Sequence, residues 1–137
     1  MRKYENFCKS LNVLRSVDFK LADDDEIYRM GIIGQFNLTF ELAWKALQAT
    51  LRRYAVPEAE TSSPREILKR GYQTGFLGEA DVWLLMLKKR NLAVHVYDEE
   101  EVDELVVLIR DSFLPVLEKL EQILGEKNGE IERDSWD

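Results

Sequence analysis

Apolar residues recur at three- and four-residue intervals along most of the chain, which is the spacing of one face of an α-helix. No segment shows the alternation of apolar and polar residues that is typical of a half-buried strand. Cys8 lies on the first such stripe and is predicted to be a small buried apolar residue, because no general base is near it in the sequence. The stripe consists of Tyr4, Phe7, Cys8, Leu11 and Leu14.

A long second helix is expected over about residues 25–53, with apolar stripes on two sides. Two apolar faces favour the central helix of a bundle or a helix at a dimer interface. Gly31 and Gly34 each cost up to about 1 kcal/mol in a helix interior, so we expect a close approach of another backbone there. Glu41 and Lys45 have the spacing of an i,i+4 ion pair. One stripe is Ile27, Met30, Ile33, Phe36, Phe40, Trp44, Leu47 and Leu51, and the other is Leu38, Leu42, Ala46 and Ala49.

The third helix has a clear start, because Ser63 and Glu66 form a capping box around Pro64 at the first helical position. We expect this helix to carry Ile67, Leu68 and Tyr72 and to end near Gly75. A fourth helix begins at about residue 79, with an inner face that consists of Trp83, Met86 and Leu87.

A second capping box, Asp98 and Glu101, begins the fifth helix. Pro115 removes a backbone hydrogen bond within this helix and is expected to bend it. The apolar stripe of the helix is Val102, Leu105, Val106, Ile109, Phe113, Leu117, Leu120 and Leu124.

Helices with short links and no internal repeat predict an all-α fold, an antiparallel up-and-down bundle of four to five helices. A chain of 137 residues has the usual length of one domain. We assign residues 1–124 to the bundle. Residues 125–137 have little apolar surface and are expected to form a frayed polar tail, in which the role of Trp136 is open.

Composition excludes several classes of function. Hydrophobic content of 45% and charged content of 33% indicate a soluble globular protein, and no apolar run approaches the length of about 20 residues that a membrane helix needs. The start of the sequence has no apolar signal core, which predicts a cytoplasmic protein. One cysteine and one histidine offer neither a disulfide nor a zinc site, so we expect no metal and no cofactor.

The net charge of −7 argues against a nucleic-acid partner, because binding to phosphates needs excess lysine and arginine. The acids are clustered, however, in residues 23–26, 98–104 and 126–137. Outside these segments bases outnumber acids, and basic pairs or triplets recur at residues 52–53, 69–70 and 88–90. A local basic surface is therefore compatible with the composition.

The candidate chemistry lies in residues 90–97, which hold the one histidine of the chain. His95 can exchange a proton near neutral pH, whereas Arg90 keeps a permanent, planar positive charge. Together they suit work on a phosphodiester. Asn91, four residues before the histidine, can orient its ring, and Tyr97 can hold a ligand or accept a modification.

Each of these residues also has a structural interpretation. Arg90 continues the buried stripe of Trp83 and Leu87, so its charge must meet an anion, an acid or a cleft, or reach solvent at the helix end. His95 can be an ordinary polar group, and Asn91 can simply end a helix. Tyr97 precedes the Asp98 cap, where it can pack as a hydrophobic staple.

Three blocks in the chain carry a family resemblance. They are residues 36–45 (FNLTFELAWK), 63–66 (SPRE) and 83–98 (WLLMLKKRNLAVHVYD). Over about residues 4–124 the chain resembles the nucleotidyltransferase substrate-binding protein family, a branch of the HEPN superfamily. The threonine or serine that often precedes the family's histidine is Val94 here.

The resemblance implies a HEPN-like helical bundle that forms a homodimer. It also implies a partner, a small minimal nucleotidyltransferase that acts as the antitoxin in related toxin–antitoxin pairs. In such pairs the HEPN member is a metal-independent ribonuclease, and Arg90 and His95 match its Arg-x4-6-His pair. The partner transfers AMP to a tyrosine that matches Tyr97.

Two functions remain open at this point. In the first, the chain is a toxin-like endoribonuclease in which His95 moves protons, Arg90 stabilises the phosphoryl oxygens of RNA and Asn91 orients the pair. AMP on Tyr97 would then block the site by bulk and negative charge. In the second, the chain is a non-catalytic subunit that binds the substrate or nucleotide of the nucleotidyltransferase. A helical scaffold with no site is the third alternative.

Overall fold

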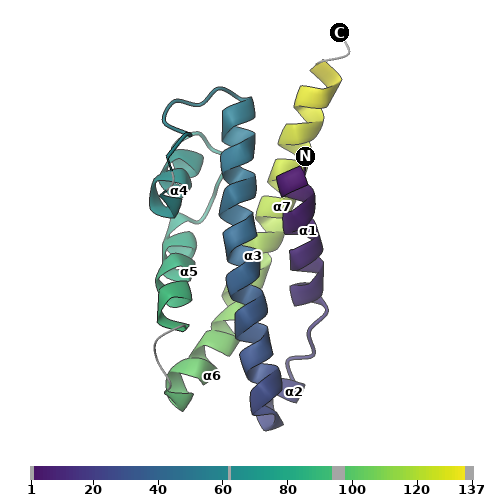
Figure 1. Ribbon diagram of the computed structural model, residues 1–137, viewed down its shortest axis with the longest axis vertical. Coiled ribbons are helices and arrows are strands. Elements are labelled where there is room, and N and C mark those ends of the chain that lie inside the picture. Colours follow the sequence, from purple (N-terminus) through teal and green to yellow (C-terminus); the bar gives the residue numbers. More distant parts are fainter. Residues whose placement is uncertain (1, 62, 94–97, 135–137) are drawn as a thin grey trace.

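The computed structural model describes residues 2–61, 63–93 and 98–134, and the regular elements among them are all helical. Figure 1 shows the long helix α3 at the centre, with α1 and α7 on one side and α4 and α5 on the other. This arrangement confirms the predicted all-α bundle. The elements are α1 (Arg2–Arg15), α2 (Leu21–Asp24), α3 (Glu26–Arg53), α4 (Pro64–Gln73), α5 (Ala80–Ala93), α6 (Glu99–Leu108), the π-helical turn η1 (Ile109–Phe113) and α7 (Leu114–Asp134).

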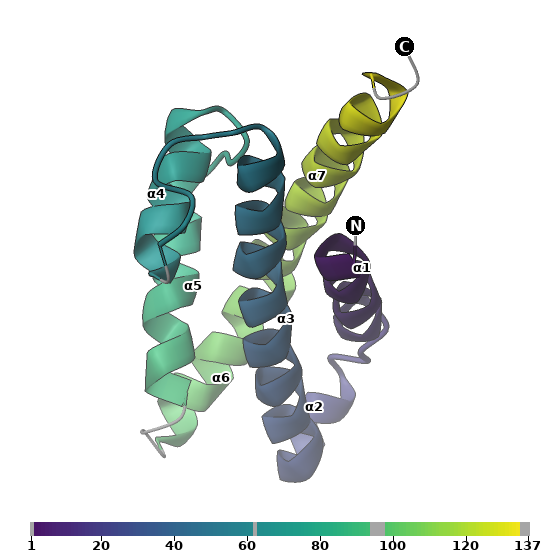
Figure 2. The ribbon, with the colours of Figure 1, turned by 45° about the horizontal axis from the view of Figure 1, so that its top comes forward.

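The core lies where α3 meets its neighbours. The turned view in Figure 2 shows α3 between α4 and α5 on one side and α1 and α7 on the other. The ring of Phe36 stacks on that of Phe113 with centroids 5.1 Å apart, and Phe40 tilts against Trp83 at 6.2 Å. These four side chains are essentially inaccessible to solvent. The aromatic pairs therefore tie α3 to η1 on one side and to α5 on the other.

The bounds of α3 confirm the prediction, with Asp25 as its N-cap accepting a hydrogen bond from the backbone N–H of Tyr28. Two apolar positions assigned to its stripes are nevertheless exposed, Ile27 at 85% and Leu38 at 51%. The expected backbone approach at Gly31 and Gly34 is also absent from the described chain, since a Cβ at either position would meet nothing within 4 Å. The short helix α2, which precedes α3, was not predicted from the sequence.

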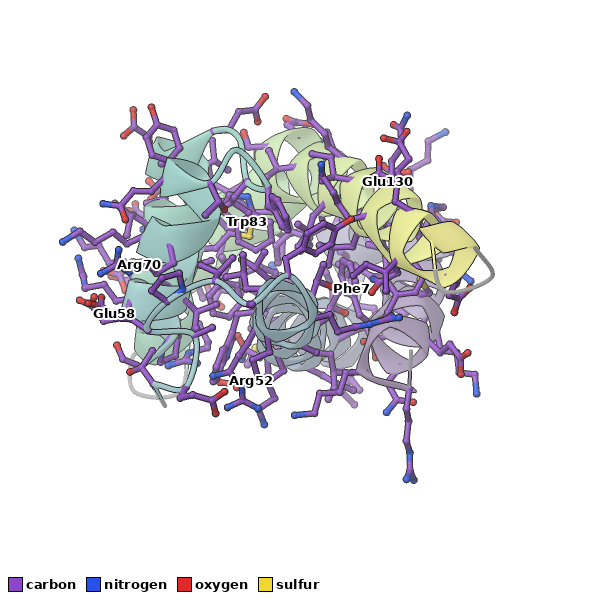
Figure 3. The ribbon with its side chains drawn as sticks, turned by 90° about the horizontal axis from the view of Figure 1, so that it is seen from above. Phe7, Arg52, Glu58, Arg70, Trp83 and Glu130 are labelled. Atoms are coloured by element: carbon purple, nitrogen blue, oxygen red, sulfur yellow. The ribbon has the colours of Figure 1, made fainter. Side chains whose placement is uncertain are left out.

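The helix α4 begins at the predicted cap, with the Ser63 side chain accepting from the backbone N–H of Glu66 and Pro64 at the first position. The other half of the predicted capping box is not formed, because the Ser63 N–H donates to Thr61 Oγ1. The connector from α3 to α4 is fastened to both helices. Gln48 donates to the carbonyl oxygens of Ala59 and Thr61 at 2.9 and 2.6 Å. Three further residues of this region are labelled in Figure 3, where Glu58 forms an ion pair with Arg70 and Arg52 forms one with Glu60.

A π-helical turn lies immediately before Pro115. The wider i,i+5 bonding of η1, in which the N–H of Leu114 bonds to the carbonyl of Ile109, re-pairs the backbone where the proline has no N–H to donate. The sequence correctly located an interruption of the helical hydrogen bonding here. It did not indicate that the interruption takes the form of a π turn.

The helix α7 continues to Asp134, whereas the polar sequence beyond Gly125 led us to expect fraying. Figure 1 shows its last turns extending past the N-terminal end of α1. One reason is Asn128, which is 3% exposed. Its amide donates to Thr50 Oγ1 and the Leu124 carbonyl at 3.1 and 2.8 Å, and its oxygen accepts from Arg53 at 2.8 Å. Another is Tyr54, whose hydroxyl bonds to the Lys127 carbonyl at 2.8 Å and to Glu130 at 3.0 Å. Polar contacts to α3 and its C-cap therefore hold a stretch that lacks an apolar stripe.

Candidate functional site

The described part of the predicted site centres on Arg90, in the last turn of α5. Its guanidinium reaches across to α3 and forms an ion pair with the carboxylate of Glu41. Both side chains are partly buried, with 21% of Arg90 and 38% of Glu41 exposed. The charge that the sequence places on a buried stripe thus meets an acid.

Two aromatic residues fix this ion pair in place. The second carboxylate oxygen of Glu41 accepts a hydrogen bond of 2.9 Å from the indole N–H of Trp44. The guanidinium carbon of Arg90 lies 5.5 Å from the ring centroid of Phe40, within the range of a cation–π contact. We refer to Phe40, Glu41, Trp44 and Arg90 as the Arg90 cluster.

The predicted pair of Glu41 and Lys45 is not formed. The ammonium of Lys45 instead lies 5.8 Å from the ring centroid of Trp44. An exposed lysine one helical turn away gains only a few tenths of a kcal/mol from such a pair. Glu41 instead directs its carboxylate toward the more buried guanidinium of Arg90.

One helical turn before Glu41 lies Asn37, whose side-chain oxygen is buried and accepts no hydrogen bond. The spacing of four residues puts both side chains on the same side of α3. A buried acceptor without a donor costs about 1–3 kcal/mol. Binding of a ligand or partner group that donates a hydrogen bond to this oxygen would therefore be favoured.

Chemically, the Arg90 cluster is a positioned guanidinium whose charge is already balanced. An anion that binds Arg90 must share it with Glu41 or displace that carboxylate. Arginine can do the former, because its planar fork offers five N–H donors. This geometry suits a guanidinium that binds or positions a partner better than one that acts through an uncompensated positive charge.

The other predicted site residues are described less fully. Asn91 is a residue of α5, which continues to Ala93. His95 and Tyr97 lie outside the described residues. In the structure, Arg90 pairs with Glu41, which in turn bonds to Trp44. The sequence analysis did not name Glu41 or Trp44 as site residues, although both lie in the block at residues 36–45.

The lone cysteine is half-buried rather than buried as predicted. Burial is the main cause of the raised pKa of its thiol, and the nearby Glu121 adds to it. Burial also raises the pKa of the neighbouring Tyr4, whose hydroxyl donates to the Glu121 carbonyl at 3.2 Å. Both groups are kept protonated, so Cys8 is a poor nucleophile.

Two global features bear on function. Among the described residues, no group of three or more His, Cys, Asp or Glu side chains is arranged to hold a metal ion. In the same part of the chain, no helix is both long enough and apolar enough to cross a membrane.

Comparison with known proteins identifies a family and related solved structures. Residues 2–126 match the family described as nucleotidyltransferase substrate binding protein like. A protein of known structure from Thermus thermophilus is 29% identical, with a TM-score of 0.67 over 91% of this chain and 98% of that one. No curated protein matches the sequence.

A second structure is from Haemophilus influenzae and is described as revealing the fold of a substrate binding domain of a nucleotidyltransferase. It is 21% identical, with a TM-score of 0.74 over 88% of this chain and 98% of that one. At this identity the likeness concerns the fold.

Proposed function

The chain belongs to the nucleotidyltransferase substrate binding protein-like family, and from this premise we propose that it is a binding subunit that works with a nucleotidyltransferase. In this proposal the nucleotidyltransferase carries out the chemistry, and the helical bundle holds the substrate for it. The family match extends from α1 into α7, so the whole bundle takes part in the resemblance.

The observation that carries the proposal is the ion pair between Arg90 and Glu41. A ribonuclease needs a guanidinium that can follow the charge developing on phosphoryl oxygens, and such stabilisation is the largest part of phosphoryl catalysis. A guanidinium held by a carboxylate and packed on Phe40 is less suited to that task. Such a guanidinium is well suited to keep the surface around Arg90 in one geometry for a partner to bind.

Within this proposal, Arg90, Asn91, His95 and Tyr97 form the surface presented to the nucleotidyltransferase. Tyr97 is the acceptor of AMP: its phenol oxygen attacks the α-phosphorus of ATP, pyrophosphate leaves, and the phenolic proton passes to solvent or a base of the partner. This part of the proposal follows the family resemblance.

The proposal is tested by producing the chain together with the small nucleotidyltransferase expected to be encoded beside it. We expect the two to copurify, and mass spectrometry of the complex to find an addition of about 329 Da, the mass of one AMP group, on Tyr97. A Tyr97→Phe variant should copurify without the added mass. Separation of the two chains on a sizing column would contradict the proposal.

The toxin-like endoribonuclease is the competing proposal for the same residues. It requires metal-independent cleavage of RNA that is lost in both Arg90→Ala and His95→Ala. We expect the purified chain to leave RNA intact in the presence of a metal chelator. Cleavage that depends on both residues would replace the binding subunit with the ribonuclease.

A further inference from the structure

An open groove of about 360 Å³ lies between α4 and α5. Among the described residues, neither Arg90 nor any other member of the Arg90 cluster lines it. Its volume is at the lower end of the range of about 300–1,000 Å³ that is usual for small-molecule sites. The groove is therefore a candidate site of its own.

The lining of the groove is mostly apolar. Leu68, Leu77 and Trp83 are buried beneath it, whereas Tyr72 is 57% exposed and Leu84 is 39% exposed. Trp83 also appears in Figure 3, where its side chain lies between α5 and the interior. A large exposed tyrosine beside an exposed leucine, over an apolar floor, offers a flat surface on which a planar ring can stack.

The rim of the groove carries unpaired positive charge. Arg65 and Lys69 are exposed and line the groove, and no carboxylate among the described residues forms an ion pair with either. Glu66 is the one acid among the described residues that line the groove. The neighbouring Arg70, by contrast, is paired with Glu58. On a chain with a net charge of −7, these two unpaired cations at an apolar groove favour an anionic ligand.

Arg65 belongs to the block at residues 63–66, in which helix capping accounts for Ser63 and Pro64. Ser63 caps α4 by accepting from the backbone N–H of Glu66, and Pro64 occupies the first position of the helix. Capping gives the side chain of Arg65 no role. Its position on the groove suggests one, which is to contact a bound ligand.

From these observations we propose that the groove binds a nucleotide, with its base on Tyr72 and Leu84 and its phosphates on Arg65 and Lys69. The inference rests on the proposed function, since it names the ligand class that a substrate-binding subunit would hold. Tyr72 and Arg65 are seven residues apart on α4, a rise of about 10 Å. Leu77, from the connector between the two helices, lines the end near Tyr72. A short groove of this kind suits one nucleotide better than a long partner helix.

The test is calorimetric titration of the full-length chain, without a partner, using ATP, adenosine and tripolyphosphate as separate probes. We expect ATP to bind more tightly than either fragment, because base and phosphates both contribute. Arg65→Gln should weaken ATP binding about tenfold through loss of a charge-assisted hydrogen bond. Tyr72→Ala should weaken it at least about fivefold through loss of stacking.

A matched variant serves as the control. Lys9→Gln removes one positive charge from an exposed position of α1, away from the groove. It should bind ATP like the wild type. ATP binding that is unchanged in Arg65→Gln and Tyr72→Ala would overturn the assignment, because the nucleotide would then lie elsewhere.

Absence of ATP binding at millimolar concentration would also overturn it. If Arg65→Gln or Tyr72→Ala then abolished copurification with the nucleotidyltransferase, the groove would be a docking surface for that protein. In that case the proposed function would stand while the nucleotide site failed. The proposed function fails by a different result: the wild-type chain does not copurify with the nucleotidyltransferase.

Discussion

The contact between Arg90 and Glu41 should be measurable as a coupling free energy. Glu41→Gln removes the negative charge but leaves an amide oxygen that can still accept from the Trp44 indole, which now bonds at 2.9 Å. Arg90→Met removes the positive charge and keeps an apolar stem over Phe40. A double-mutant cycle of these two changes therefore isolates the ion pair.

The expected size of the coupling follows from burial. With 21% and 38% of the two side chains exposed, solvent screens the pair in part. Fully exposed pairs contribute about 0.2–1 kcal/mol, and breaking a buried pair costs about 3–5 kcal/mol. We expect a coupling of about 1 kcal/mol, and a fall in melting temperature of about 3 °C for Glu41→Gln.

The assay is urea unfolding followed by circular dichroism, with free energies of unfolding compared across the cycle. A parallel cycle of Glu41→Gln with Lys45→Gln is the control, because Lys45 lies over Trp44 rather than on the carboxylate. That cycle should give a coupling of only a few tenths of a kcal/mol at most. Equal couplings in the two cycles, or none in the first, would refute the geometry of the Arg90 cluster.

Four further changes test the packing. Gly71→Ala should destabilise the fold by about 1–3 kcal/mol, because the new Cβ would lie 2.8 Å from a leucine side-chain carbon. Gly31→Ala, whose new Cβ would meet nothing within 4 Å, should stabilise the fold by up to about 1 kcal/mol. Thermal melts of the two variants test both predictions. Asn128→Ala should lower the free energy of unfolding by about 1–2 kcal/mol in urea, and an unchanged midpoint would mean that the end of α7 contributes nothing. Ser63→Ala should cost about 1 kcal/mol in the same assay, unless the cap is not formed in solution. Because burial raises the pKa of Cys8, less thiolate is present at pH 8 when the chain is folded, so iodoacetamide should modify the native protein more slowly than the urea-unfolded one; equal rates would contradict this.

Local sequence signals predicted much of the fold. Ser63 begins its helix as expected, because a capping side chain bonds to a backbone N–H only a few residues away. Pro115 marked the interruption in the last helix for the same local reason. Such signals depend on neighbours in the sequence, so they can be read without knowledge of the packing.

Features that depend on distant residues were not predictable in this way. The partner of Arg90 lies 49 residues away on another helix, and Asn128 bonds to a threonine 78 residues away. Periodicity likewise placed Ile27 and Leu38 on apolar stripes without indicating that no described neighbour covers them. In the candidate site, the sequence left open whether the charge of Arg90 meets an anion, an acid, a cleft or solvent. It could not indicate that Glu41 forms the ion pair.

The most direct test of the central claim is pyrophosphate release from ATP by the nucleotidyltransferase proposed as its partner, measured with and without this chain. A substrate-binding subunit should raise the release, and the increase should saturate once the two chains reach a fixed ratio. Release that is the same at every concentration of the helical chain would contradict the account.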